Sequence, residues 1–287
     1  MISVRERSGK RRDPATVTEQ KTEALSVDVD SLKPEEHGIV LCYPGLDLSS
    51  FDSRISQLRK IGVRELVLEG LSKVGKYGII GRGCVSVVVK ARLAGYDDLV
   101  ALKIRRVDAN RVDMQRDYEL QKLANCVGVG PKAFVATQDL FTMEFIDSFK
   151  IGKWFESIRT RTPKKEVRAL VKDVLEQCYL LDSHGLDHGE LSNPSKHILI
   201  RNPETFEGKR KTVIIDYESA STQRRPSNLT AVSAFLFLGG WQSEKLRKIL
   251  GLPSGGLSRK KLISMLGDYK SYPRSEALEK IFAYLHL

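Results

Sequence analysis

The stretch from residue 184 to residue 219 constrains the fold of this chain more than any other. Its two short apolar runs, 198–200 and 213–215, are typical of buried strands, and Asn-Pro and Gly-Lys between them are turn signals, so the strands can pair as a hairpin. Glu190 precedes the first strand in a polar loop and Asp216 ends the second, which predicts both carboxylates on one side of a small sheet. Such a pair suits phosphoryl transfer, in which one acid orients the nucleophile and the other holds a metal ion against phosphates. Either acid alone would be an ordinary loop residue.

A glycine-rich segment lies upstream and reads Gly81-Arg-Gly83-Cys-Val-Ser86-Val-Val88. Its flanks predict two strands, and glycines at the hairpin tip let backbone amides approach phosphate oxygens without interference from a Cβ atom. It is not a Walker loop, because no Gly-Lys-Ser/Thr follows, and no helix begins after it as a dinucleotide-binding fingerprint requires. An ordinary hairpin could carry the same glycines.

The next predicted strand, Leu99 to Arg105, carries Ala101 and Lys103. Lys103 lies between apolar residues, and an ammonium group that loses its water is costly unless it meets an anion. This position therefore favours a lysine that binds an anion over an edge-strand lysine that faces water.

A helical stripe from Val112 to Val127 follows and ends at Gly128. It carries two candidate partners for the lysine. Asp117 lies three residues before Leu120 of the apolar stripe, whereas Glu119 has the longer reach. Either could also be a solvated helix acid, and the sequence leaves this choice open.

Three further elements complete the order. Residues 134–136 and 140–146 predict paired strands, and 164–183 form the clearest helix, with apolar residues at i, i+3, i+4, i+7, i+8, i+11 and i+14. This helix leads the chain to the Glu190 loop. About three helices should follow residue 229.

The segment His188-Gly189-Glu190-Leu191 resembles the catalytic loop of kinase-like phosphotransferases, in the His-Gly-Asp form of atypical kinases. Ile215-Asp216-Tyr217-Glu218 resembles their metal-binding strand end, and Val-Ala-Leu-Lys103 resembles their lysine strand. Over about residues 75–220 the order of motifs is similar to that of the archaeal predicted Ser/Thr protein kinases, an atypical family related to the Rio kinases and to the kinase of the KEOPS complex. The resemblance implies an α+β, two-lobed protein-kinase-like fold with a short helical C-lobe and a small N-terminal extension.

The resemblance also implies bound ATP and Mg²⁺. Lys103 would hold the phosphates and pair with Asp117 or Glu119, Asp216 would hold the metal, and Glu190 would be the base or orienting group. Further contacts to the nucleotide would come from the glycine hairpin, the neighbouring strands and the strand entering the hinge, namely Gly81, Gly83, Ser86, Val88, Ala101, Met143, Glu144 and Ile146.

The chain departs from the family pattern in its catalytic loop. Glu190 stands where an aspartate is usual, and Ser195 stands where a metal-binding asparagine should follow. His197 immediately precedes the next strand, which implies a two-residue insertion, but imidazole suits Zn²⁺ better than the oxygen-seeking Mg²⁺. The second metal ligand is therefore open between His197 and Asn193, and His197 could instead be a structural hydrogen-bonding residue.

Three functions are compatible with these residues. We expect an ATP-dependent atypical Ser/Thr protein kinase that transfers the γ-phosphate of Mg-ATP to a protein hydroxyl, with the protein substrate unspecified. The alternatives are a Rio-like ATPase that gates a ribonucleoprotein or tRNA-related complex, and a nucleotide-binding pseudokinase that acts as a scaffold.

The formal net charge is +11, and basic residues gather near the N-terminus and over 149–172. Such charge favours polyanions, so RNA or a ribonucleoprotein is one expected partner, with solubility and attraction to ATP as equal explanations. Four scattered cysteines predict reduced thiols and a cytoplasmic location, and no apolar run is long enough to cross a membrane.

The sequence predicts four segments. These are a mobile basic arm over 1–36, a small strand–helix–strand extension over 37–74, a kinase N-lobe over 75–146 and a kinase-like C-lobe over 147–287.

Overall fold

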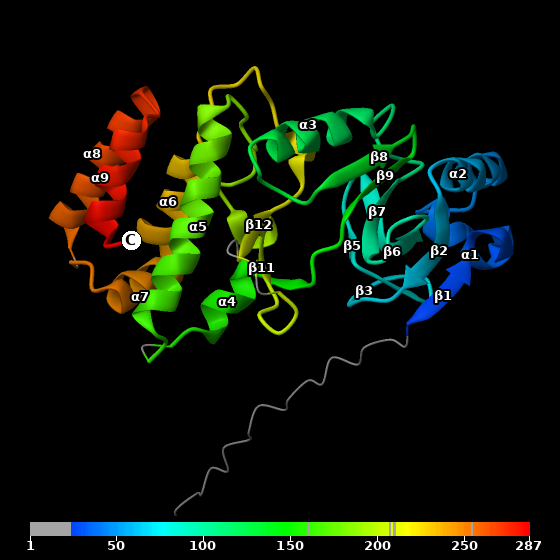
Figure 1. The fold of residues 1–287 in the computed structure, drawn as a ribbon, viewed down its shortest axis with the longest axis horizontal. Helices are drawn as coiled ribbons and strands as arrows, with labels where there is room; N and C mark the ends of the chain where they lie inside the picture. The colour runs from blue at the N-terminus through cyan, green and yellow to red at the C-terminus, as the bar shows by residue number, and fades with distance from the viewer. Residues whose placement is uncertain (1–23, 160, 207, 209–210, 254) are drawn as a thin grey trace, which may run out of the picture.

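The chain has a mixed α+β fold, as predicted, in a computed structural model that describes residues 24–287 except 160, 207, 209, 210 and 254 (Figure 1). Residues 24–146 build a sheet-rich part, and residues from 147 onward build a mostly helical part. Each part has its own apolar core. Helix α3 (Gln115–Cys126) lies between them in Figure 1 and packs on both strand β8 (Ala133–Ala136) and the 3₁₀ turn η3 (Tyr217–Ser219).

One antiparallel sheet dominates the first part. Its strands run in the order β1 (Leu25–Asp28), β2 (Val63–Leu68), β6 (Ser86–Leu93), β7 (Leu99–Arg105), β9 (Leu140–Glu144) and β8 (Ala133–Ala136), and β5 (Gly81–Arg82) pairs with β6. The 3₁₀ turn η1 (Val29–Ser31), α1 (Pro34–Leu41), α2 (Leu48–Lys60) and the hairpin β3 (Ser72–Val74)–β4 (Tyr77–Ile79) complete this part. The predicted glycine hairpin, lysine strand and β8–β9 pair are confirmed as local structure.

The predicted arm over 1–36 is wrong for its last residues, because β1 extends the sheet and α1 begins at Pro34. The remainder of that arm, residues 1–23, lies outside the described residues. The extension over 37–74 is not a strand–helix–strand unit either: its first predicted strand is part of helix α1, where Pro34 and two first-turn glutamates favour a helix start. An apolar run this short does not separate strand from helix.

The extension also shares its core with the sheet rather than packing on it from outside. Phe51 of α2 and Leu66 of β2 belong to the same apolar cluster as Val89 and Leu102 of the central strands. The extension and the sheet therefore form one packed unit, whereas Leu120, Ala124 and Val129 in and after α3 belong to the core of the second part.

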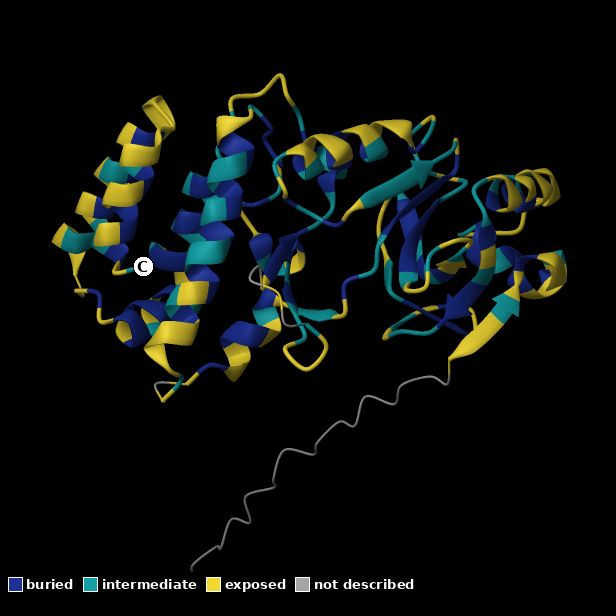
Figure 2. Ribbon diagram, in the orientation of Figure 1, coloured by how far each residue is buried: buried dark blue, intermediate teal, exposed yellow. Residues whose placement is uncertain are grey.

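The second part surrounds one long helix. Its elements are β10 (Ser148–Lys150), α4 (Ile151–Ser157), α5 (Lys164–Ser183), η2 (Pro194–Lys196), β11 (Ile198–Arg201), β12 (Thr212–Ile214), η3 (Tyr217–Ser219), α6 (Asn228–Phe237), α7 (Gly240–Leu250), α8 (Gly256–Ser271) and α9 (Ser275–Leu285). Helix α5 has the predicted bounds and packs against α6, α7 and β12, and Figure 2 shows its central turns largely covered while the outer faces of α8 and α9 are exposed.

Strands β11 and β12 pair as the sequence predicts, and β10, which it does not predict, joins them on the other side of β11. In the described part of the C-terminal segment four α-helices follow η3 rather than three, because Gly239 and Gly240, the latter at φ +71°, separate α6 from α7. Among the described residues no helix has the length and apolar character needed to cross a membrane, and all four cysteines are free thiols.

A buried ionic network fastens α2 to the sheet. The carboxylate of Asp139, in the β8–β9 turn, accepts hydrogen bonds from Arg54 Nη2 at 3.3 Å, Gln57 Nε2 at 2.8 Å and Arg105 Nε at 2.8 Å. Arg54 is 1% exposed and Asp139 is 6% exposed. Because both guanidinium groups share this carboxylate away from water, its loss would leave buried charge uncompensated.

We predict that Asp139→Asn lowers the free energy of unfolding at pH 7 by about 3 kcal/mol. Burial alone would raise the pKa of Asp139, but Gln57 and the two arginines outweigh it and lower the pKa. The stabilisation is therefore present above the ordinary aspartate value of about 4 and is lost as the pH falls through the lowered pKa of the folded state. Denaturant unfolding at several pH values measures the difference.

The matched control is Asp30→Asn, because Asp30 pairs with Arg59 at an exposed position where an ion pair contributes little. Equal destabilisation by the two substitutions would contradict the structural role given to Asp139. So would a decrease in the free energy of unfolding of Asp139→Asn that stays the same size at acid pH.

Candidate functional site

Lys103 is the centre of the strongest polar cluster between the two parts of the chain. It lies on β7, is 6% exposed, and pairs in register with Val88 of β6 and Phe141 of β9. Its Nζ atom lies 2.7 Å from Asp216 Oδ1 and 3.9 Å from Asp117 Oδ2. A strand, a helix and the end of another strand thus meet at one ammonium group.

The charges in this cluster support one another. Burial alone would lower the pKa of Lys103, but Asp216 and Asp117 outweigh it and raise the pKa. Burial alone would raise the pKa of Asp216, but Lys103 outweighs it and lowers the pKa. Burial raises the pKa of Asp117 in spite of the nearby cations. Asp216 is therefore the principal counter-ion of Lys103, in agreement with the shorter distance.

The structure resolves the choice between the two acids of α3. Asp117 is buried, contacts Lys103, and accepts a hydrogen bond from Arg111 Nη1 at 2.5 Å. Glu119 is exposed and accepts a hydrogen bond from Gln115 of its own helix. Asp117 is the acid that faces the lysine.

Asp216 has an unusual backbone conformation. Its φ and ψ are both 73°, in the left-handed region that aspartate tolerates better than most residues. The turn carries the chain out of β12 into η3, with the Asp216 carboxylate at Lys103 and Tyr217 buried against the His188 ring, 5.0 Å between ring centroids.

Glu190 lies at the same end of the β11–β12 hairpin, as the sequence predicts. The backbone N–H of Ile215 donates to the carbonyl of His197 at 2.9 Å, so His197 and Asp216 are neighbours across the hairpin. His197 Nε2 lies 2.9 Å from Glu190 Oε2, and His197 Nδ1 lies 3.9 Å from Asp216 Oδ2. The other carboxylate oxygen of Glu190 accepts a short hydrogen bond from the Ser219 hydroxyl.

The loop that carries Glu190 is held from behind by buried polar contacts. The backbone N–H of His188 donates to Asn228 Oδ1 at 2.8 Å, and His188 Nε2 lies 2.9 Å from the carbonyl of Ile215. Burial lowers the pKa of His188 to about 4, so the ring is neutral at pH 7 and Nε2 carries the proton donated to that carbonyl. Gly189 has φ +88°, and a Cβ there would lie 2.6 Å from both Ser219 O and Arg224 Nη2. A glycine is required at this position.

Arg224 bridges the two sides of the site. Its Nε donates to Asp187 Oδ2 at 2.9 Å, just before the Glu190 loop, and its Nη2 donates to the carbonyl of Ser219 at 2.6 Å. Nothing in the local sequence pattern marks Arg111, Ser219 or Arg224 as site residues. Their partners lie up to 107 residues away along the chain.

The glycine hairpin is next to the Lys103 strand in the sheet, and one of its backbone amides already forms a hydrogen bond. Gly83 N–H donates to the carbonyl of Ser86 at 2.9 Å, and Arg106 Nη1 donates to the Gly83 carbonyl at 3.0 Å. A Cβ on Gly81 would meet nothing within 4 Å, so backbone access is open there. Ser86 is buried on β6, opposite Arg105, rather than at the tip.

Several predicted nucleotide contacts form one small apolar cluster. Ala101 and Met143 are buried next to each other on β7 and β9, and Ile80, Val88 and Phe145 pack on them. The other two predicted contacts differ in character. Ile146 is buried, whereas the Glu144 carboxylate accepts a hydrogen bond from Arg201 Nη2 at 2.8 Å.

The implied metal ion fits some of these residues and not others. Lys103 occupies only Oδ1 of Asp216, and the buried His197 Nδ1, which faces Oδ2, makes no hydrogen bond with any described residue. The side chain of Asn193 is exposed and forms no hydrogen bond with either acid, although its backbone N–H donates to the Glu190 carbonyl at 3.2 Å. The donor set therefore fits a cation at Asp216 and His197, and it gives no support to Asn193.

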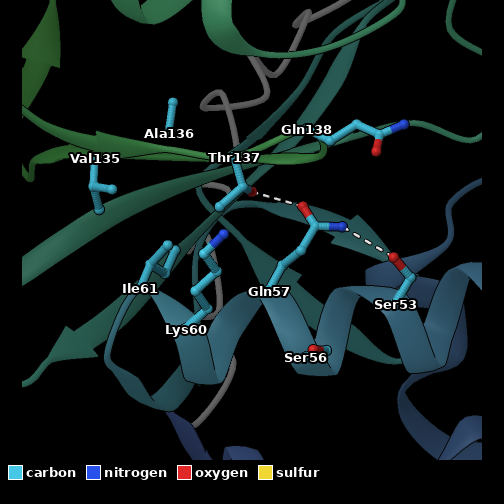
Figure 3. Close-up of a pocket in the computed structure, with 9 residues that line it drawn as sticks. All are labelled: Ser53, Ser56, Gln57, Lys60, Ile61, Val135, Ala136, Thr137 and Gln138. Atoms are coloured by element: carbon cyan, nitrogen blue, oxygen red, sulfur yellow. Dashed lines mark hydrogen bonds between the residues drawn. The ribbon is translucent and has the colours of Figure 1, made fainter.

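A separate hollow of about 540 Å³ lies between α2 and the β8–β9 turn (Figure 3). Gln57 bridges it, accepting a hydrogen bond from the Thr137 hydroxyl at 2.6 Å and donating to the Ser53 hydroxyl at 3.2 Å. Lys60 is the one charged residue in its lining. Because the lining of this hollow has no carboxylate, we place the candidate site at the Lys103 cluster, where opposite charges from β7, α3 and the end of β12 converge.

Comparison with known proteins gives one informative relative. No protein-family model matches the chain. The uncharacterized protein MJ1211 of Methanocaldococcus jannaschii is 31% identical over 110 residues, which span 38% of this chain and 84% of that protein. The name of this relative states no activity, so the site chemistry has to carry the functional assignment.

The hydroxyl of Tyr217 supplies a test of the packing beside Asp216. It is buried and has no hydrogen-bond partner among the described residues, which costs stability. We predict that Tyr217→Phe raises the free energy of unfolding by about 1 kcal/mol, measured by denaturant titration. The matched control is Tyr269→Phe, which should lower it by about the same amount because Tyr269 donates to Asp182 Oδ2 at 3.0 Å. Equal destabilisation by both would show that the Tyr217 hydroxyl has a partner.

Proposed function

The chain belongs to the same family as the archaeal protein MJ1211, and we propose that it is an ATP-dependent atypical Ser/Thr protein kinase with a two-lobed kinase-like fold. In this proposal the sheet-rich part is the N-lobe and the helical part is the C-lobe. The reaction transfers the γ-phosphate of ATP to a protein hydroxyl. One observation carries the proposal: Lys103, Asp117 and Asp216, which are far apart in sequence, form a single ion cluster in which Lys103 and Asp117 are buried and Asp216 is partly exposed.

The charge balance of this cluster suits a polyphosphate. An ammonium group has three donors, so Lys103 can bind phosphate oxygens, as the resemblance implies, in addition to Asp117 and Asp216 Oδ1. Mg²⁺ bound with the nucleotide neutralises phosphate charge and is held by Asp216.

Two neighbouring features support the nucleotide part of the proposal. The open backbone at Gly81 permits close approach of phosphate. Ala101 lies on β7 with Lys103, and Val88 and Met143 lie on the two strands that pair with β7. This apolar cluster supplies a surface against which a purine ring can pack.

Glu190 fills the orienting role in this proposal. Its Oε1 atom accepts a hydrogen bond from the Ser219 hydroxyl, so this oxygen has the geometry to accept an O–H group. A substrate hydroxyl that replaces Ser219 would be held in the same way, at the end of the hairpin that carries Asp216. Positioning of this kind contributes to phosphoryl transfer without requiring a strongly perturbed pKa.

A Rio-like ATPase is the second candidate, and the Glu190–His197 pair favours it. His197 fixes one oxygen of the carboxylate at 2.9 Å and Ser219 engages the other. A carboxylate held on both sides has less room for a protein hydroxyl than for a water molecule. The ATPase and the kinase differ in the acceptor of the phosphate, so one assay of both products separates them.

We predict that Lys103→Ala weakens ATP binding by tenfold or more, because a charge-assisted contact to phosphate is lost. Isothermal titration calorimetry in Mg²⁺ measures the dissociation constant. The acids of α3 give a matched pair: Asp117→Asn should also weaken binding, whereas the exposed Glu119→Gln should leave it unchanged. If Lys103→Ala binds ATP as tightly as the unaltered chain, Lys103 is not the phosphate ligand.

We predict that Glu190→Gln lowers turnover about a hundredfold while nearly preserving ATP affinity, as expected for a positioning group. Asp216→Asn should abolish turnover, and Glu190→Asp tests whether the usual residue works in this loop. Incubation with labelled ATP should follow phosphate release and autophosphorylation together, with Glu119→Gln as the control.

Phosphate release without autophosphorylation would favour the ATPase. Turnover of Glu190→Gln that equals that of the unaltered chain would place the orienting role elsewhere. ATP binding without either product in any variant would identify a pseudokinase.

A further inference from the structure

The imidazole of His197 is fixed between two carboxylates. The residue is 9% exposed, with Nε2 at 2.9 Å from Glu190 Oε2 and Nδ1 at 3.9 Å from Asp216 Oδ2. The first distance is within the range of a hydrogen bond or close ion pair, and the second is too long for a hydrogen bond. Nδ1 is buried and has no hydrogen-bond partner among the described residues.

These distances determine which nitrogen carries the proton. An ionised carboxylate can only accept hydrogen bonds, so the nitrogen that lies beside Glu190, Nε2, is the one that carries the N–H. A second proton on Nδ1 would be a buried donor without an acceptor, which is costly. Nδ1 therefore presents a lone pair toward Asp216.

A nitrogen lone pair and a carboxylate oxygen that face each other can both bind the same cation. Two ligand atoms that each lie about 2.1 Å from one ion can be up to about 4.2 Å apart, and the 3.9 Å between Nδ1 and Oδ2 falls within that limit. Asp216 Oδ2 is free for this role because Lys103 binds Oδ1. Glu190 completes the pattern, since histidine ligands commonly donate their other N–H to a carboxylate.

We propose that His197 Nδ1 and Asp216 Oδ2 together bind the divalent cation that accompanies the nucleotide, and that this pair favours a first-row transition-metal ion over Mg²⁺. The inference rests on the proposed nucleotide site. Mg²⁺ prefers six oxygen ligands, whereas imidazole suits transition-metal ions.

The protein supplies only part of the coordination shell. Among the residues that the structure describes, no group of three or more His, Cys, Asp and Glu side chains is arranged to hold a metal ion. The remaining ligands come from phosphate oxygens and water, as is usual for nucleotide-bound metals. Cation binding therefore depends on the nucleotide, and a chain without nucleotide should bind the metal weakly.

Mn²⁺ is the appropriate probe because it binds most weakly in the divalent first-row series, so its preference over Mg²⁺ is a lower limit for the later ions. Calorimetry should compare binding of a non-hydrolysable ATP analogue with Mn²⁺ and with Mg²⁺. We expect the Mn²⁺ complex to bind about tenfold more tightly, and His197→Asn should reduce this preference to near unity. The matched control His184→Asn removes an exposed histidine at the end of α5 and should keep the preference.

Pulsed electron paramagnetic resonance of the Mn²⁺ complex gives a readout that does not depend on activity. We expect a ¹⁴N coupling from a directly bound imidazole, which His197→Asn removes. In uniformly ¹⁵N-labelled protein the coupling should change to that of ¹⁵N, which distinguishes a protein nitrogen from adenine and does not require a variant to fold.

Nucleotide binding without a protein nitrogen coupling and without a Mn²⁺ preference would overturn the inference and leave the proposed nucleotide site intact. Absence of nucleotide binding with either cation would overturn both.

Discussion

The buried Lys103 ammonium group is the constraint on which the site depends. Removing it from water is costly, and Asp216 and Asp117 offset that cost only if β7, α3 and the end of β12 are held in register. Two apolar cores perform this task, one beneath the sheet and one around α5. The ion cluster therefore depends on the packing of both parts of the chain, and Leu120 and Ala124 of α3 belong to the same apolar core as α5.

A second layer of polar contacts gives the Glu190 loop its geometry. The 3₁₀ turn η2 leads directly into His197, and the His197 ring lies between Glu190 and Asp216. Glutamate has the reach to meet this ring and the Ser219 hydroxyl at once. Glu190 and His197 thus form one arrangement in which the position of each side chain depends on the other.

Local sequence pattern predicted the strands and helices that carry the site. It failed where contacts between residues far apart in the sequence determine the structure. The apolar run of β7, the helical spacing in α5 and the turn signals between β11 and β12 are properties of neighbouring residues, so they could be predicted from the sequence. The choice of Asp117 over Glu119 required the direction in which α3 faces β7. Helix α1 was missed because its short apolar run does not by itself distinguish a helix from a strand. Strand β1 was missed because four residues carry too little pattern, and their extended structure comes from pairing with β2.

The N-terminal helix α2 connects to the site through polar contacts that no local pattern reveals. Arg54 and Gln57 hold Asp139, which binds Arg105 on β7, and Arg105 Nη1 donates to the Arg111 carbonyl at 3.0 Å.

Arg111 in turn binds Asp117, the buried partner of Lys103, and its Nη2 donates to the Glu218 carbonyl at 2.7 Å, two residues after Asp216. Energetic coupling along this series of polar contacts would require two alternative arrangements of the groups. The structure contains one arrangement, in which each group contacts the next. We therefore assign the series a structural role: α2 holds the loop that positions Arg111, and Arg111 fixes the acid that keeps Lys103 in place.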